Sequence, residues 1–332
     1  MKKSIKLVSI VLALVLTAAL ASVFVACNKK TNDGGKADLR FAAPEGTPAL
    51  AMLTFAVDKE NIDGHKVTYA AVSPSNIASE MATKSADIVI MPINAGAKLI
   101  GVDGADYKLV SVAVSGSLYM VAGSNEGGAL TIDDVKGKKV ACIGQTGVPG
   151  LVFRYVMNAN GVGMVTSGEP NENQVLVQYV ADGAQARTLL SDGQVDFIVV
   201  GEPAATATKA SLGKTRELDM QAAYAAANEN NGDTYPQAGL FVRTALANDG
   251  TFMADLFQKL AANKTWVSEN AAQVTAKARQ LYESAVFPAP SIPRCAVDGA
   301  RLNYEKQAQI IAFLKNVMPS VDWDSAKDNI FG

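Results

Sequence analysis

Small polar residues, glycine and proline recur in this chain where an apolar strand-like run gives way to a helical run. Such junctions carry free N–H groups and the partial positive end of a helix dipole, so they hold oxygen atoms of a bound molecule well. The same residue types also cap helices whatever the protein does, and this alternative stays open for each of them. We expect ligand contacts from Glu45, Gly46, Thr47, Ser75, Asn76, Asn94, Gln145, Thr146, Gly147 and Glu202.

Three further candidates lie where the chain is expected to cross between two parts of the molecule. Ser117 and Tyr119 belong to the first crossing and Tyr235 to the second. The two tyrosines are the best aromatic candidates for facing a ligand, with packing under a hinge as the alternative for both. Glu202 precedes a proline at a helix start, so we expect it both to accept a hydrogen bond from the ligand and to complement the helix dipole.

Catalytic and metal chemistry find little support in the sequence. The only histidine, His65, lies outside the junctions, and no nucleophile–base pair stands at a useful spacing. Cys142 and Cys295 are far apart, each in an apolar run, so we expect two buried free thiols rather than a disulfide. No cluster of metal ligands is present. These observations argue against a catalytic centre, and we expect no bound metal or cofactor.

Charge narrows the class of ligand. The formal net charge is −2, from 30 basic and 32 acidic residues, so no single-sign field exists to hold nucleic acid. The candidate positions include Glu45 and Glu202, whereas the arginines, Arg154 and Arg294, are more distant. A sulfonate normally attracts a cation clamp, so a neutral or donor-rich organic solute, such as a pyrimidine, is favoured. A sulfonate or nitrate stays as the alternative, because helix N-termini alone can hold an oxyanion.

The N-terminus has the layout of an export signal. Three lysines within the first six residues are followed by an apolar run over residues 7–25 and then by Cys27. This order resembles a bacterial lipobox, with Phe24 in place of the more usual leucine. It implies a signal peptide over residues 1–26, a diacylglycerol-modified Cys27 and a polar tether over residues 27–37. An uncleaved membrane helix is the alternative.

The remaining chain alternates short strand-like runs with longer helical ones, which is typical of α/β layers. The expected strands are 39–43, 66–71, 87–91, 107–114, 118–122, 139–143, 175–180, 197–200 and 236–243. The expected helices are 49–59, 75–83, 94–101, 150–160, 183–192, 202–209, 251–270, 271–285 and 304–317. The last three helices have no sheet of their own, so we expect them to pack on the first part of the chain.

Four segments, in chain order, resemble the type II periplasmic-binding-protein superfamily, in its sulfonate, taurine, nitrate and thiamine-pyrimidine branch. Residues 85–96 are similar to the strand and turn "G-x-x-D-x-x-x-x-P-x-N-A", and residues 132–140 to "L-x-D-L-K-G-K-K-V". Residues 144–150 take the place of a small-residue loop before a helix. Residues 189–203 resemble "L-x-x-G-x-V-D-x-x-x-x-x-E-P".

This resemblance implies an α/β, two-lobe type II fold with a ligand cleft between the lobes. Lobe I would comprise residues 38–117 and 237–332, and lobe II residues 118–236. The implied function is that of a monomeric, lipid-anchored extracytoplasmic protein of an ABC importer, which captures a solute by hinge closure and delivers it to the permease and ATPase subunits. An enzyme of the pyrimidine or menaquinone-pathway type on the same fold, or a lipoprotein sensor domain, is the alternative.

Overall fold

The computed structural model describes residues 36–228 and 234–331. The expected signal peptide, Cys27 and most of the expected tether lie outside these residues. The account that follows concerns the unit that begins at Asp38.

The first sheet has five strands, and the side chains of its inner strands β1, β3 and β11 are mainly buried on both faces. Its spatial order is β2 (Val67–Val72), β1 (Leu39–Pro44), β3 (Ile88–Pro92), β11 (Pro236–Arg243) and β4 (Tyr107–Ser115). β1 runs parallel to β2 and β3, whereas β11 is antiparallel to both of its neighbours. Strands buried on both faces read as near-continuous apolar runs, and this is why the sequence predicted them. We call the residues packed around this sheet the first lobe.

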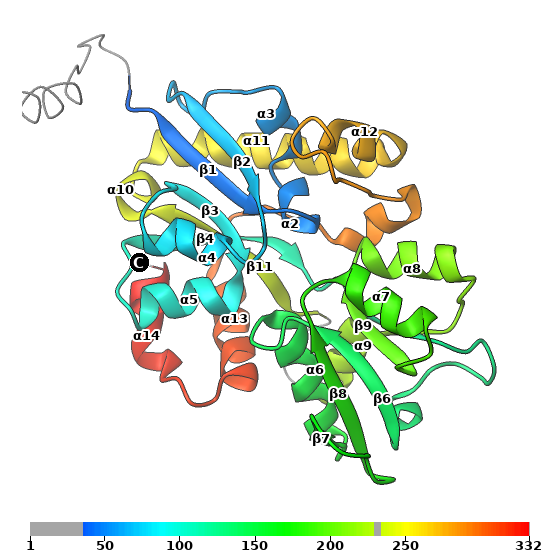
Figure 1. Ribbon diagram of the computed structural model, residues 1–332. Coiled ribbons are helices and arrows are strands. Elements are labelled where there is room, and N and C mark those ends of the chain that lie inside the picture. The colour runs from blue at the N-terminus through cyan, green and yellow to red at the C-terminus, as the bar shows by residue number, and fades with distance from the viewer. Residues whose placement is uncertain (1–35, 229–233, 332) are drawn as a thin grey trace, which may run out of the picture. The chain divides into compact units, whose positions relative to one another are not determined.

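Helices cover both faces of the first sheet (Figure 1). One face carries α3 (Leu53–Val57) and α11 (Gly250–Glu269), whose Phe252 and Leu256 join a core with the strands. The short α2 (Thr47–Leu50) and α12 (Val274–Ala278) pack beside them in a smaller cluster. The other face carries α4 (Ile77–Ala82), α5 (Ile93–Gly101), α13 (Tyr304–Val317) and α14 (Trp323–Phe331).

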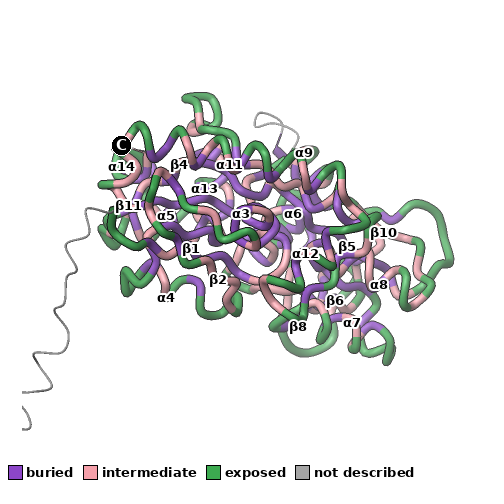
Figure 2. The backbone as a smooth tube through the Cα atoms, turned by 90° about the horizontal axis from the view of Figure 1, so that it is seen from above, coloured by how far each residue is buried: buried purple, intermediate pink, exposed green. Residues whose placement is uncertain are grey.

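The second sheet has six strands and defines the second lobe. Its order is β10 (Glu217–Asp219), β5 (Leu118–Ala122), β9 (Phe197–Gly201), β6 (Lys138–Ile143), β8 (Gln174–Val180) and β7 (Gly163–Val165). One face is covered by α6 (Val148–Ala159) and α9 (Met220–Ala227), and the other by α7 (Gly183–Ser191) and α8 (Ala204–Leu212). The chain enters this sheet after β4 and returns to the first sheet at β11. The strands of both lobes are mainly buried and their connections are mainly exposed (Figure 2).

Two expected helices were wrong in extent. The helix predicted over 49–59 is broken into α2 and α3, because the buried Asn263 inserts between them. Its side-chain amide donates to Leu50 O at 2.8 Å, and its carbonyl accepts from Thr54 N at 2.9 Å. The helix predicted over 271–285 is reduced to α12 after a 3-10 turn at Ala271–Gln273. Polar pairing within the fold thus overrides local helix preference in α2–α3.

Other elements were missed or placed differently. The short strands β7 and β10 and the helices α9, α10 (Thr244–Ala247) and α14 had not been predicted. α13 contacts α6 of the second lobe as well as α14, so it does not pack on the first lobe alone.

Cys142 and Cys295 are buried and free, as predicted. Over the described ranges, no helix combines the length and apolar character needed to cross a membrane.

Candidate ligand cleft between the two lobes

Two hydrogen bonds join strand-end loops of one lobe to strand-end loops of the other. The first begins at Thr47, which follows β1 and is 3 % exposed. Its Oγ1 donates to the main-chain carbonyl of Glu202, which follows β9, at 2.8 Å. Gly46 shapes this loop with a φ of 95°, a value that favours glycine, and its N–H donates to the hydroxyl of Tyr282 at 3.1 Å. Thr47 and Glu202, one predicted site residue from each lobe, are therefore in direct contact.

The second contact is made by Asn94, at the start of α5. Its Nδ2 donates to the carbonyl of Thr146, ahead of α6, at 3.0 Å. Asn94 is 4 % exposed, and its Oδ1 is buried without a hydrogen-bond partner. The loop before α6 is held tightly, because a Cβ at Gly150 would lie 2.5 Å from Gly144 O. Asn94 thus joins the two lobes through its Nδ2, whereas its Oδ1 is buried and unpaired.

Glu202 has a fully buried carboxylate at the start of α8. It accepts from Thr206 N at 3.1 Å and from Thr206 Oγ1 at 2.9 Å, and Arg294 Nε lies 2.6 Å from its Oε1. Burial raises the pKa of Glu202, while Arg294 and the Thr206 hydrogen bonds act to lower it. The carboxylate is therefore occupied by the protein's own groups, in addition to its place beside the helix dipole.

Arg294 contacts the candidate residues although the sequence reasoning set it aside as distant. It lies in the 3-10 segment Ala289–Cys295 of the first lobe, far from any strand–helix junction, so no local signal marked it. It forms two 2.9 Å hydrogen bonds with Glu217 and lies with its guanidinium carbon 3.8 Å from the centre of the Tyr119 ring. The expectation that Arg294 lies at a distance from the candidate positions was wrong, because it contacts two of them, Glu202 and Tyr119.

Arg154 was also expected to be distant, but it lies near the contact between Asn94 and Thr146. A pocket of about 530 Å³ adjoins Asn94 and is lined by residues of both lobes, including Lys98, Thr146 and Arg154. None of its lining residues is acidic. The two exposed cations and the loop groups therefore suit an oxygen-rich or anionic group, which the sequence reasoning had disfavoured.

Ser117 and Tyr235 lie at the crossings between the lobes. The carbonyl of Ser117 accepts from Glu202 N at 2.9 Å, so Ser117 helps to position the Glu202 main chain that accepts from Thr47. Tyr235 is 1 % exposed, stacks on Phe313 at 5.7 Å between ring centres, and donates from its hydroxyl to Gln221 at 2.9 Å. These contacts correspond to the hinge-packing alternative for Tyr235.

The remaining candidates are not joined to the two contacts by any hydrogen bond that we observe. Ser75 and Asn76 are exposed, and Ser75 Oγ bonds locally to Ser73 Oγ at 2.9 Å. Glu45 accepts from Ser284 at 3.4 Å. Gln145 and Gly147 lie beside Thr146 in the loop before α6. Within residues 36–228 and 234–331, no group of three or more His, Cys, Asp or Glu side chains is placed to hold a metal ion.

Comparisons with known proteins bear on the fold. No protein-family model and no curated protein matches the sequence. An ABC transporter structure from Parabacteroides distasonis superposes with a TM-score of 0.68 at 16 % identity, over 87 % of this chain and 94 % of that one. The periplasmic aliphatic sulphonate-binding protein of Escherichia coli gives 0.62 at 15 %, over 87 % and 91 %. The alkanesulfonate-binding protein of Xanthomonas axonopodis pv. citri, bound to MOPS, gives 0.56 at 15 %, over 90 % and 96 %.

At these identities the similarity shows the fold. The chain has the two-sheet α/β fold of periplasmic solute-binding proteins. In open α/β sheets the ligand site lies at the carboxyl ends of the strands, which is where Thr47, Asn94, Thr146 and Glu202 are found.

Proposed function

We propose that this chain is the extracytoplasmic substrate-binding lipoprotein of an ABC importer. It captures a small organic solute between lobe I, residues 38–117 and 237–332, and lobe II, residues 118–236. The pair of contacts Thr47–Glu202 and Asn94–Thr146 carries this proposal, because strand-end loops of two lobes meet there directly. Loops that meet across a hinge close around a solute and release it when the lobes separate.

The similar structures support transport rather than catalysis. Two of them are named as sulfonate-binding proteins and one as an ABC transporter. The described part of this chain adds no nucleophile–base pair at the two contacts, where the groups are a hydroxyl, an amide and main-chain carbonyls. Binding and release require only such groups.

The ligand class follows from the charges near the cleft. A neutral or donor-rich solute was favoured because the arginines were expected to lie farther away, and Lys98 and Arg154 in the pocket beside Asn94 remove that reason. Sulfonates and nitrate therefore enter on equal terms with pyrimidines.

The N-terminal segment supplies the location in this proposal. Cleavage after residue 26 and acylation of Cys27 would hold the protein at the outer face of the cell membrane. The polar residues 28–37 would then link the anchor to the first lobe. A monomer in this position would dock on the permease, which works with its ATPase subunit.

A thermal-shift screen tests the proposal. Protein starting at Asn28 is heated with pyrimidines, nucleobases, amino acids, aliphatic sulfonates or nitrate, because a ligand that binds the folded state raises the melting temperature. We expect a dose-dependent rise for one class, with the solute recovered unchanged. Consumption of the solute would favour an enzyme on this fold, and the absence of any shift would contradict solute capture.

A further inference from the structure

Three side chains of the second lobe form a compact acidic and aromatic site. Tyr119 lies on β5, Glu217 on β10, and Glu202 directly after β9. These strands are neighbours in the order β10-β5-β9, with Asp219 paired to Tyr119 and Gly201 to Leu118. We call these three residues the cation box. Because one hydrogen-bonded sheet positions all of them, the box does not depend on the first lobe for its walls.

The box holds a guanidinium group in this structure, that of Arg294. Both terminal nitrogens bond to the two oxygens of Glu217 at 2.9 Å, and the guanidinium carbon lies 3.8 Å from the Tyr119 ring centre. Glu202 Oε1 is 2.6 Å from Nε. A bidentate carboxylate, an aromatic face and a second carboxylate are the groups that recognise a planar cation.

The occupant comes from the other lobe. Arg294 belongs to the segment Ala289–Cys295, which packs against α11 and against the turn that precedes α12. Its neighbour Cys295 is buried in the cluster with Leu50 and lies 3.6 Å from Thr47 Oγ1. The side chain therefore bridges the lobes: its backbone is fixed in the first and its charge is bound in the second.

Arg294 does not match the box completely. Its Nε is buried but finds no acceptor with hydrogen-bond geometry, so the contact with Glu202 is an ion pair without an aligned hydrogen bond. The side chain of Arg294 is 26 % exposed, whereas that of Glu202 is fully buried. Glu217 is also shared with Lys209 at 2.8 Å. Withdrawal of Arg294 would uncover a buried carboxylate that then requires another cation.

We propose that the cation box is a guanidinium-binding site that the chain fills with its own Arg294. In this state Arg294 acts as a tethered ligand that holds the lobes together. When the first lobe moves away, the vacated box accepts a guanidinium group from a solute, which stacks on Tyr119 and pairs with Glu217. The box shares Glu202 with the Thr47 contact but uses its carboxylate rather than its main-chain carbonyl, so it does not depend on which solute the importer carries.

The experiment adds methylguanidinium to wild-type protein and to Arg294→Ala, with N-methylurea as the neutral isostere. Titration calorimetry should show methylguanidinium binding to Arg294→Ala at least tenfold more tightly than to wild type, where the tethered arginine competes. N-methylurea should bind to neither. Adding Glu217→Gln to Arg294→Ala should remove the binding, because the bidentate acceptor is lost.

A folding control keeps the test decisive. Arg294→Ala leaves Glu202 unpaired, so circular dichroism is recorded first, and Arg294→Ala/Glu202→Gln replaces it if the single variant unfolds. That double variant keeps Tyr119 and Glu217 and should still prefer methylguanidinium over N-methylurea. Equal, weak binding of methylguanidinium to wild type and to the folded variant would overturn the proposal. The importer solute is absent throughout, so this result does not depend on the outcome of the thermal-shift screen.

Discussion

The hydroxyl of Thr47 donates to the main-chain carbonyl of Glu202 across 155 positions of sequence, and this bond connects the two lobes. It is buried, and it lies where the loop after β1 meets the loop after β9. A buried carbonyl without a donor destabilises the fold, because it has lost its water and gained no partner. The bond therefore favours contact between these loops. The same geometry places the start of α2 opposite the start of α8.

Thr47→Val removes this donor while keeping the shape of the side chain. We expect the free energy of unfolding to fall by about 1 kcal/mol, because the Glu202 carbonyl loses its partner. Urea denaturation measures the change. The control is Thr83→Val, whose exposed hydroxyl bonds only to nearby groups of its own lobe, Ser79 O and Ser85 Oγ. Equal effects of the two variants would contradict an interlobe role for Thr47.

Asn94→Asp should weaken the second contact. At neutral pH the new carboxylate has no N–H to donate to the Thr146 carbonyl, and its charge would be buried at a site that is 4 % exposed. We expect a loss of about 1–3 kcal/mol in the free energy of unfolding. Asn76→Asp, in the exposed loop before α4, is the matched control and should change stability little. An unchanged free energy of unfolding for Asn94→Asp would show that the contact between Asn94 and Thr146 is not formed in solution.

Much of the fold could be predicted because strands buried on both faces leave an unbroken apolar run in the sequence. β1, β3, β4, β5 and β11 were expected within a residue or two of their observed bounds. The break between α2 and α3 could not be foreseen, since Asn263, which causes it, is more than 200 positions away. A long-range side-chain hydrogen bond leaves no local pattern.

The candidate site was predictable only where local rules place it. Thr47, Asn94, Thr146 and Glu202 sit at strand–helix junctions, and the structure joins them in pairs. Arg294 could not be found in this way, because its 3-10 segment is not at a strand–helix junction. Only the tertiary fold brings its side chain to the candidate residues. The charge of the cleft was therefore misjudged although its position was inferred.

The two acidic residues of the cation box should give stability–pH slopes of opposite sign. Burial raises the pKa of Glu202 in the folded state, so the folded chain binds more protons and this contribution to stability falls as pH rises above about 4.3, the ordinary glutamate value. Burial acts in the same direction on Glu217, but the hydrogen bonds from Arg294 and Lys209 outweigh it and lower its pKa. Its contribution is therefore present above that pH and is lost as pH falls through the folded-state pKa.

Urea denaturation of wild type, Glu202→Gln and Glu217→Gln between pH 3 and 7 tests these slopes. The stability of wild type relative to Glu202→Gln should decrease with rising pH, and that of wild type relative to Glu217→Gln should increase. Slopes of the same sign for both variants would contradict the assigned environments.

The two buried thiols should be inert in the native protein. Burial raises the pKa of Cys295 to about 12 and that of Cys142 further, so neither forms an appreciable amount of thiolate at neutral pH. Protein starting at Asn28 should take up no N-ethylmaleimide when folded and two equivalents in denaturant, as measured by intact mass. Rapid modification of the native protein would show that one of these sites opens readily.

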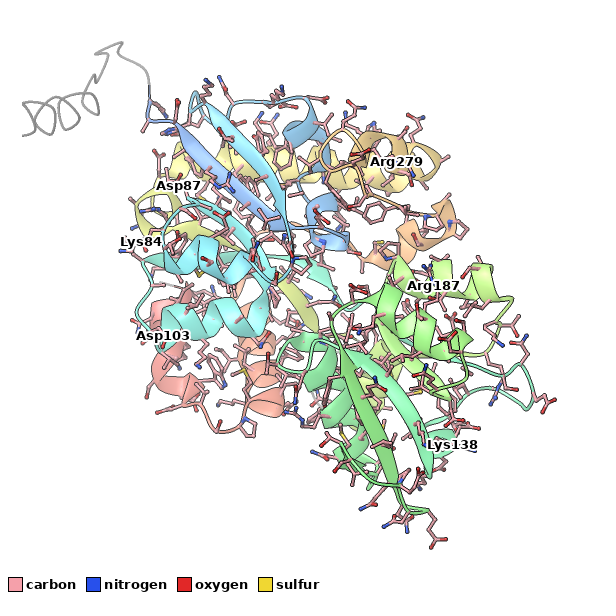
Figure 3. The ribbon with its side chains drawn as sticks, in the orientation of Figure 1. Lys84, Asp87, Asp103, Lys138, Arg187 and Arg279 are labelled. Carbon is pink, nitrogen blue, oxygen red and sulfur yellow. The ribbon has the colours of Figure 1, made fainter. Side chains whose placement is uncertain are left out.

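The inert thiols allow the central claim, solute capture by lobe closure, to be tested with fluorescent labels. Asp103→Cys in the first lobe and Lys138→Cys in the second place labels on exposed residues of the two lobes (Figure 3). Lys84→Cys with Asp103→Cys, both in the first lobe, is the control pair. Single-molecule energy transfer between the interlobe labels should shift to one high-efficiency population when the solute from the thermal-shift screen saturates the protein, with no shift in the control. An unchanged interlobe distribution with the solute bound would contradict capture by lobe closure.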